Sequence, residues 1–315
     1  MTLLSKFEKT PWLWAWIGAC GVWAITAIYT GGVGSAEVLS AALTFGSFFV
    51  IVAIGQMFVI TLGPGNVDLS IPACMTLAGT VAMKTKDGST AMIPIGMVLA
   101  QAIGFGVGSV NYALIRLLRI PPIIATLSSG FIFQSTAIWW NRGLRVKPPE
   151  LLADFTTAKI MGIPVIALCV LGLAVLAHVL LTRTIFGRSV IAIGQNQRAA
   201  HLAGIKVERV RASTYMLSAT LAGLCGFLLS GFSGGAALNM GEEYLLSSIA
   251  VVVIGGTSVA GGFANVPGLW GASLFLFLLV TMLNTLGAGA GVRLVLTGLI
   301  IIGVIVAASG GRNRT

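Results

Sequence analysis

Charged residues are scarce in this chain. Asp, Glu, Lys and Arg make up 9% of its 315 residues, whereas 57% are hydrophobic and the mean hydropathy is +0.98. A water-soluble domain of this size with such a composition would expose large apolar patches. The composition therefore excludes a soluble protein and predicts a polytopic integral membrane protein.

Acidic residues and histidines are especially few, and none is arranged for catalysis. The 9 acidic residues fall mainly at loops or at the ends of apolar runs, and His178 and His201 have no companions at ligand spacing. The chain contains no Gly-x-x-x-x-Gly-Lys-Ser/Thr phosphate loop. We therefore expect no catalytic residue, no metal site and no cofactor. Any ATP that drives this protein would be hydrolysed by a separate subunit.

Ionisable side chains are nearly absent from the centres of the apolar runs. A charge there costs about 2.5 to 3.5 kcal/mol on the insertion scale and is kept where a coupling ion or a proton must be bound. Their scarcity argues against an ion-coupled secondary transporter or a channel. Neutral Asn, Gln and carbonyl groups can still coordinate sodium, so this class stays open as an alternative.

The four cysteines lie in separate apolar runs, at Cys20, Cys74, Cys169 and Cys225. This spacing predicts neither a disulfide framework nor a zinc site, and we expect four small, buried, apolar side chains. The net charge of +10 does not indicate nucleic acid, because the basic residues form no continuous stripe with interleaved aromatic residues. Membrane lipid and topology explain the charge better.

Apolar runs of membrane-spanning length recur along the whole chain. They predict an all-α fold of about ten transmembrane helices in a single domain over residues 1–315. Two of the runs, 69–83 and 245–260, are short for a full crossing. The N-terminal run, 11–30, resembles a signal peptide, but similar segments follow it, so we interpret it as an uncleaved span. The ten runs are 11–30, 38–62, 69–83, 91–116, 121–140, 160–181, 212–232, 245–260, 266–286 and 291–308.

Basic residues predict the orientation. With both termini in the cytoplasm, more Lys and Arg residues fall on the cytoplasmic side than outside, as the positive-inside rule requires. The loop 141–159 is itself basic and lies on the outer side. The cytoplasmic set is Lys6, Lys9, Arg116, Arg119, Arg183, Arg188, Arg198, Lys206, Arg209, Arg211, Arg312 and Arg314, and the outer set is Lys84, Lys86, Arg142, Arg145, Lys147, Lys159 and Arg293.

Two glycine-rich stretches interrupt apolar runs. In the first, the sequence from Gly63 to Pro72 contains Gly65, Asn66, Asp68 and Ser70. Gly and Pro break the helix there, and Asp68 with Ser70 can cap the helix that resumes, although direct contact of Asp68 with a solute stays open. The second stretch contains Gly255, Gly256, Thr257 and Ser258. Aligning Gly65 with Gly255 places Asp68 opposite Ser258, which predicts an internal repeat.

Glycine is abundant, with 41 residues. The runs 104–108 and 287–291 each alternate glycine with larger residues inside an apolar segment, which predicts close helix packing at both. A few polar residues inside the spans could line a solute path, although each is equally typical of helix packing: Gln56, Gln101, Asn111, Gln134 and Asn284.

The densest basic segment, 183–211, carries a family resemblance. Thr184 to Arg188, Ala192 to Asn196 and Ala199 to Ile205 resemble the cytoplasmic loop of permeases from bacterial ABC importers of ribose and other monosaccharides. The stretches 65–70, 121–127 and 249–262 agree with the same family in the same order. The resemblance covers most of the chain from about residue 45 onward.

This resemblance implies a permease subunit in the inner membrane that works by alternating access. Its expected partners are a second permease subunit, the same or homologous, together with cytoplasmic ATP-binding subunits and a periplasmic or lipid-anchored solute-binding protein. The solute implied is a monosaccharide or related polyol; branched-chain amino acids or nucleosides are the alternatives. A short cytoplasmic coupling helix would dock on the ATPase through Gln195, Asn196, Arg198, Ala199, Ala200, His201, Leu202, Ala203, Gly204 and Ile205.

The chain also departs from the family pattern. Arg198 stands where the wider family has Glu before the Ala-Ala pair, so a contact of that carboxylate cannot be carried over. Asn66 and Pro72 stand where sugar permeases usually have Gly, which predicts a stiffer first break.

Overall fold

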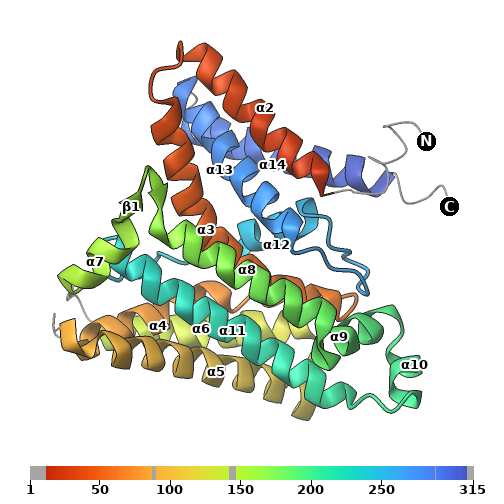
Figure 1. Cartoon of the computed structure of the whole chain (residues 1–315). Helices are drawn as coiled ribbons and strands as arrows, with labels where there is room; N and C mark the ends of the chain where they lie inside the picture. Colours follow the sequence, from red (N-terminus) through yellow and green to blue (C-terminus); the bar gives the residue numbers. More distant parts are fainter. Residues whose placement is uncertain (1–11, 87–89, 142–146, 288, 311–315) are drawn as a thin grey trace.

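The computed structural model describes residues 12–86, 90–141, 147–287 and 289–310, and this part of the chain is almost wholly helical (Figure 1). The elements up to residue 141 are α2 (Leu13–Tyr29), α3 (Ser35–Thr61), α4 (Ile71–Lys86), η1 (Thr90–Met92), α5 (Ile93–Leu117) and α6 (Pro122–Asn141). Those after it are α7 (Glu150–Thr157), β1 (Lys159–Ile160), β2 (Ile163–Pro164), α8 (Val165–Arg183), α9 (Ile185–Gln195), α10 (Gln197–Leu202), α11 (Val207–Phe232), α12 (Tyr244–Ile254), α13 (Pro267–Thr285) and α14 (Ala290–Gly310).

A helix lies on each of the ten predicted apolar runs, which confirms the all-α polytopic fold. The segments expected to be short are short: α4 has 16 residues and α12 has 11. Among the described residues, 5 helical segments are long and apolar enough to cross a membrane by themselves: Ser35–Thr61, Thr90–Leu117, Val165–Arg183, Val207–Phe232 and Pro267–Thr285. Shorter apolar helices, α2, α4 and α12 among them, complete the bundle.

Helix α11 forms the centre of the bundle, where it packs against α3, α4 and α5. Glycine allows the close approach of α5: a Cβ at Gly104 or Gly108 would collide with the backbone of Ala219 or Tyr215 on α11. Gly223 of α11 approaches Ala100 in the same way. Helix contact through small residues replaces the hydrophobic drive that lipid cannot supply.

The packing expected at the first glycine run is therefore confirmed, but the expectation for the second run is wrong. Gly287, Gly289 and Gly291 have open space where a Cβ would stand.

The expectation of four buried cysteines is also only half right. Cys74 and Cys225 are buried, whereas Cys20 and Cys169 are exposed on α2 and α8.

Helix α8 presents a broad apolar face outward, through Leu168, Leu171, Val175, Leu176 and Val179. Such a face is unfavourable in water and is what a helix in contact with lipid tails requires. The composition and the helix lengths agree on this point, and the protein is a multi-pass membrane protein.

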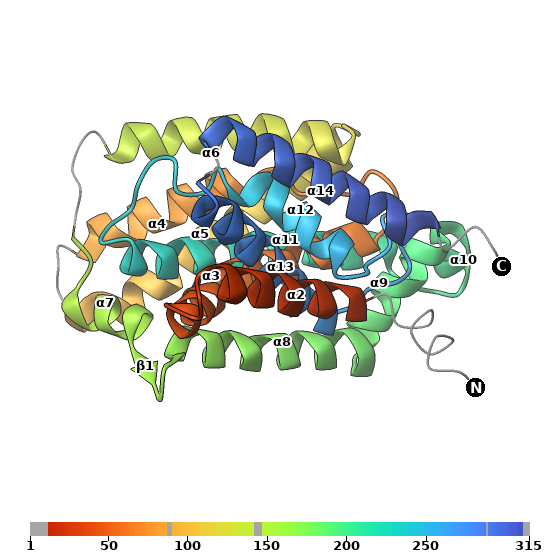
Figure 2. The same cartoon turned by 90° about the horizontal axis from the view of Figure 1, so that it is seen from above.

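The two ends of the bundle differ (Figures 1 and 2). One end carries α9, α10 and the start of α11, and α2 begins and α14 ends at that same end. The opposite end carries α7 and the β1–β2 hairpin, in which Lys159 pairs with Pro164 and Ile160 with Ile163. Segment 183–211, expected to be a loop with one short helix, consists instead of two helices and the first turn of a third.

Candidate functional site

The first helix break is built around a buried carboxylate. The chain leaves α3 at Thr61, turns through Gly63 and Gly65 at φ values of +117° and +77°, and re-enters a helix at Ile71. Positive φ values favour glycine because a Cβ would clash with the backbone. Asp68 is 1% exposed in this turn.

Asp68 accepts three hydrogen bonds. Its Oδ1 accepts from the backbone N–H of Ser70 at 3.0 Å and from the Ser70 hydroxyl at 2.6 Å, and its Oδ2 accepts from the Ser218 hydroxyl of α11 at 3.1 Å. The carboxylate thus satisfies an amide just before α4 and fastens the break to α11. A buried acid so fully hydrogen-bonded is held in the way that buried polar groups require.

The network continues into α5 and α6. Asn111 of α5 donates to the Ser70 hydroxyl at 2.7 Å, and the Ser129 hydroxyl of α6 donates to the Asn111 side-chain oxygen. Thr126 of α6 accepts from the backbone N–H of Leu69 at 3.0 Å. Residues on three helices, α5, α6 and α11, therefore share one buried polar cluster with the break.

Asn66 ties the break to the start of α11. Its side-chain oxygen accepts from Arg211 at 3.3 Å and from the Tyr215 hydroxyl at 3.2 Å, while its Nδ2 donates to the Gly63 carbonyl at 3.1 Å. A glycine at this position could make none of these side-chain bonds. The departure at Asn66 thus adds a cross-link between the break and α11.

Gln56 completes the cluster from α3. Its Oε1 accepts from the backbone N–H of Asp68 at 3.2 Å, whereas its Nε2 is buried and has no hydrogen-bond partner among the described residues. A buried amide donor without an acceptor costs roughly 1–3 kcal/mol. Such a group is the one most able to gain from a new acceptor.

The second break follows α12 and is held by hydrogen bonds between its own residues. The Ser258 N–H donates to the Phe263 carbonyl at 3.0 Å, and the Asn265 N–H donates to the Thr257 hydroxyl oxygen at 3.3 Å. Thr257 and Ser258 are both buried, and Gly256 turns the chain at a φ of +91°. Gly255 approaches the backbone of Gly268 at the start of α13. Ser258 thus holds its turn through its backbone, whereas Asp68 does so through its side chain.

The two breaks and α9 meet at one glycine junction, formed by Gly63, Gly194, Gly261 and Gly262. The Gly262 N–H donates to the Thr61 carbonyl at 3.0 Å, which joins the second break to the end of α3. A Cβ at Gly194 would collide with both of these backbone groups, and a Cβ at Gly261 would collide with Gly63. Backbone therefore contacts backbone here with no side chain between them.

Two residues, Gln195 and Asn196, separate that junction from α10. Gln195 ends α9, and Asn196 caps α10 by accepting the Ala199 N–H on its Oδ1 at 3.0 Å. The expected docking helix Asn196–Ile205 is in fact the six-residue α10, because Ala203 and Gly204, at a φ of +86°, end it.

The side chains of α10 differ in exposure. Ala200 is buried and anchors the helix, while Ala199, Leu202 and Ala203 form an exposed apolar face, with Leu202 81% exposed. Arg198 and His201 are exposed as well. The helix therefore presents apolar and cationic side chains together to the surroundings of the protein.

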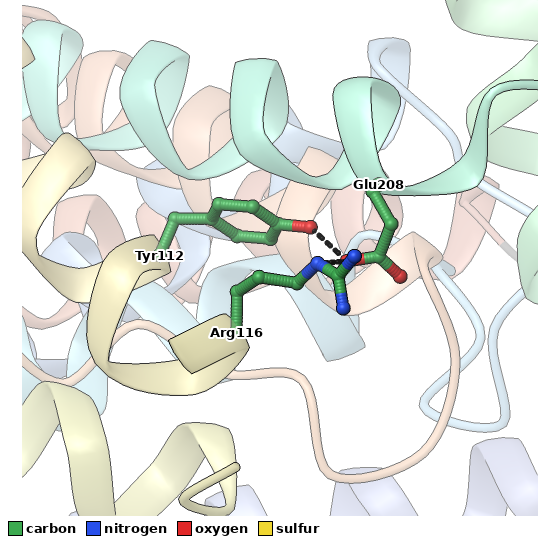
Figure 3. Close-up of polar contacts among 3 residues, drawn as sticks. All are labelled: Tyr112, Arg116 and Glu208. Atoms are coloured by element: carbon green, nitrogen blue, oxygen red, sulfur yellow. Dashed lines mark hydrogen bonds and ion pairs between the residues drawn. The ribbon is translucent and has the colours of Figure 1, made fainter. Parts of the chain in front are cut away.

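A charged contact fixes the start of α11 next to α10 (Figure 3). Glu208 Oε2 accepts from the Tyr112 hydroxyl at 2.6 Å and pairs with Arg116 Nε at 2.7 Å, both on α5. The Arg116 and Glu208 side chains are 59% and 43% exposed. An ion pair so exposed contributes only about 0–1 kcal/mol, so its effect is chiefly to position α11.

Comparison with known proteins assigns the chain to a family. Residues 38–305 match the family described as the permease component of branched-chain amino acid transport systems. The chain belongs to this permease family. The match covers both breaks and the α9–α10 segment.

Individual relatives of the permease carry more specific names. The ribose import permease protein RbsC of Bacillus subtilis (strain 168) is 34% identical over 259 residues, 80% of this chain and 78% of the relative. The autoinducer 2 import system permease protein LsrC of Enterobacter sp. (strain 638) is 27% identical over 274 residues, 86% and 79% of the two chains. RbsC of Escherichia coli (strain K12) is 29% identical over 258 residues, 80% and 79%. No solved structure matches the permease.

Of the five polar residues that could line a solute path, two belong to the Asp68 cluster and three do not. Gln56 and Asn111 lie in the Asp68 cluster. Gln134 donates to the Leu238 carbonyl at 2.6 Å, and Asn284 accepts from Arg293, so these two lie apart from the cluster; Gln101 is half-buried on α5.

Several cluster members escaped sequence reasoning. Thr126, Ser129 and Ser218 look like ordinary polar residues of apolar helices, and Tyr215 and Arg211 look like the end of a basic loop. Their common signal is a polar side chain that faces a helix break from a helix packed against it. That signal needs the helix pairing, which the sequence by itself does not provide.

Proposed function

We propose that this permease is the membrane subunit of an ATP-binding cassette importer and that it moves a monosaccharide or related polyol by alternating access. One observation carries the mechanism: the segment that resembles an ATPase-docking loop reaches, at Gly194, the junction where the two helix breaks meet. A displacement of α10 thus has a short route, through packed backbone, to the ends of α3 and α12. Packed cores are stiff and transmit small shifts instead of absorbing them.

The family and the named relatives support the class of solute. The ribose and autoinducer 2 import permeases match over 80–86% of this chain. The family description names branched-chain amino acids instead, and this is the second candidate. In the described part of the chain, Gln56 Nε2 is a buried donor with no acceptor, and we assign it to a solute hydroxyl that enters when the breaks separate.

We further propose that the end with α9 and α10 faces the cytoplasm of a bacterial inner membrane and that both termini lie on that side. Cations are denser there, in agreement with the positive-inside rule. In the described part of the chain, that end carries Arg116, Arg119, Arg183, Arg188, Arg198, Lys206, Arg209 and Arg211, and the opposite end carries Lys84, Lys147, Lys159 and Arg293.

The proposed partners follow from this placement. ATP-binding subunits, which hydrolyse the ATP, contact α10, and a second permease subunit, the same or homologous, supplies the other half of the path. A solute-binding protein approaches the opposite end, where α7 and the hairpin stand. The permease itself then needs no catalytic group, metal or cofactor.

The test is uptake into vesicles that contain the permease with its ATP-binding subunits and solute-binding protein. We expect uptake of labelled ribose that requires ATP. Leu202→Asp places a charge on the exposed face of α10 and should abolish both this uptake and the recovery of the ATP-binding subunits with the purified permease. Met161→Asp, at a 99% exposed apolar residue of the opposite end, is the matched control and should leave ATPase recovery unchanged.

Three results would redirect the proposal. Uptake of leucine in place of ribose would select the amino-acid alternative. Uptake that needs a sodium gradient and no ATP would select a secondary transporter. Recovery of ATP-binding subunits that is insensitive to Leu202→Asp would remove α10 from the contact. Ala200→Glu is a poorer choice of variant, because Ala200 is buried and its replacement would disturb the helix itself.

A further inference from the structure

A groove of about 740 Å³ separates α10 from the start of α11. Its lining is strongly cationic: Arg198 on α10 faces Lys206 and Arg209 on the α11 side, with His201 beside them. These side chains are exposed, and within the described residues none of the three cations forms an ion pair or a side-chain hydrogen bond. The groove therefore holds positive charge that the permease does not neutralise.

The one acid in the groove does not neutralise these cations either. Glu208 lines the groove, but its Oε2 is already occupied by Arg116 at 2.7 Å and Tyr112 at 2.6 Å (Figure 3). Arg116 balances its charge from outside the groove. Among the described residues, the lining cations are left without a counter-charge.

Hydrogen bonds within the permease hold both walls of the groove. Asn196 caps one end of α10, and the Gly204 and Ile205 N–H groups donate to the His201 and Ala200 carbonyls at 3.0 and 3.1 Å at the other end. Glu208 fastens the α11 wall to α5. A preformed site loses little conformational entropy on binding.

We propose that this groove receives a carboxylate-bearing segment of the ATP-binding subunit, whose acidic side chains pair with Arg198, Lys206 and Arg209 while Leu202 packs against an apolar surface of the same subunit. The inference rests on the proposed function and adds the chemistry of the partner surface. Charge complementarity of this kind sets the register of an interface and speeds its formation.

A protein carboxylate fits this site better than anionic lipid. Helix α10 lies beyond the ends of α8 and α11 in Figure 1, at the extremity of the molecule, whereas lipid headgroups surround the ends of the spans. An apolar residue that is 81% exposed, next to unpaired cations on a capped helix, is also the arrangement of an apolar anchor with a charged rim at a protein interface.

The experiment is zero-length cross-linking of the purified complex with a water-soluble carbodiimide, which condenses a carboxylate with a lysine amine into an amide and takes up the lost water as a urea. We expect a covalent product that joins Lys206 to an Asp or Glu of the ATP-binding subunit, identified by peptide mass spectrometry. Lys206→Arg keeps the charge but has no amine that forms this amide, so this product should disappear while the complex is still recovered.

A second measurement tests the energy of the contact. Recovery of the ATP-binding subunit in lipid-free detergent should fall at least tenfold in Arg198→Glu/Lys206→Glu at 50 mM NaCl, and wild-type recovery should itself fall as salt rises to 500 mM. Arg183→Gln, an exposed cation at the same end but outside the groove, should behave as wild type.

The outcomes separate the two proposals. A complex that forms normally but gives no Lys206 product, and that tolerates Arg198→Glu/Lys206→Glu, overturns the acidic-partner inference and leaves the importer intact. A difference that appears only in bilayers with anionic lipid assigns the groove to lipid and also overturns it. Failure of the wild type to recover any ATP-binding subunit defeats the proposed function itself.

Discussion

Asp68 shows how one buried side chain can hold a helix break together. It accepts from the Ser70 backbone, the Ser70 hydroxyl and the Ser218 hydroxyl, and it is 1% exposed. Removing the acceptor leaves buried donors without partners, at about 1–3 kcal/mol for each. The side chain therefore acts on the fold of the break whether or not a solute ever touches it.

This predicts that Asp68→Leu lowers the stability of the permease by about 2–4 kcal/mol, since at least the Ser70 amide loses its acceptor. Asp68→Asn should cost much less, because its amide oxygen keeps both Ser70 bonds and its amide nitrogen can donate to Ser218. Thermal unfolding in detergent, followed by a thiol-reactive dye that reports exposure of the buried Cys74 and Cys225, measures both.

The background for that measurement should carry Cys20→Ser and Cys169→Ser, because these two thiols are exposed before unfolding. Asp154→Leu, at an exposed acid on α7, is the control and should unfold near the wild-type temperature. Equal destabilisation by Asn and Leu at position 68 would show that the negative charge matters, and not the hydrogen bonds.

Sequence reasoning at this scale predicted one side of the Asp68 site only. Pro64, Gly65 and Pro72 indicated a break, and the Asp-x-Ser spacing indicated a cap, because both signals are local. The partners Asn111 and Ser218 lie far along the chain, and only the packing of α5 and α11 brings them to Ser70 and Asp68. Contacts of this length are set by tertiary packing.

At the scale of elements, the connection of α9 to both breaks is the feature most relevant to coupling. Gly194 lies where a Cβ would collide with the Thr61 carbonyl and the Gly262 N–H, the two groups that join the breaks. Backbone in direct contact moves together, because no flexible side chain can take up a shift. The close approach therefore predicts that added bulk at position 194 separates the breaks from α9.

We expect Gly194→Ala to abolish uptake in the reconstituted importer while the ATP-binding subunit is still recovered, since α10 keeps its exposed face. Uptake and subunit recovery are measured on the same preparation. Gly172→Ala is the matched control: this glycine of α8 has open space at its Cβ position, so alanine should leave uptake unchanged and can add up to about 1 kcal/mol of helix stability.

Normal uptake with Gly194→Ala would show that the junction tolerates displacement and does not transmit motion. Loss of subunit recovery together with uptake would mean that the variant distorts α10 itself. In that case the dye-based unfolding temperature distinguishes a misfolded permease from a local effect at the junction.

The spans could be predicted from the sequence, whereas the segment that connects them to α10 could not. Apolar runs long enough for a bilayer can satisfy their backbone only as helices, which is why the ten windows located ten helices. Helix α9 contains Arg188 and is amphipathic, and α11 begins with Glu208, Arg209 and Arg211, so hydropathy missed α9 and the first turn of α11. Helix α7, within the expected outer loop 141–159, escaped for the same reason, and the β1–β2 hairpin occupies the start of the run 160–181, which was expected to be helical.

At the scale of the whole molecule, the two ends of the bundle differ, and this difference predicts how the protein is oriented in the membrane. Helices α9 and α10 lie at the end where α2 begins and α14 ends, and the hairpin with α7 lies at the other (Figure 2). Because the bundle is continuous between them, a label on each end reports the same orientation from opposite sides. The excess of cations at the α10 end predicts that this end is cytoplasmic.

Site-directed labelling can test that orientation in spheroplasts, with a membrane-impermeant maleimide and the Cys20→Ser/Cys169→Ser background. Leu202→Cys, at an 81% exposed position of α10, should label only after the membrane is permeabilised, and Met161→Cys, at a 99% exposed position of the hairpin, should label at once. Detergent-solubilised protein is the control in which both must react. Immediate labelling at position 202 with protection at position 161 would invert the topology, place α10 away from ATP, and so contradict the importer mechanism at its first step.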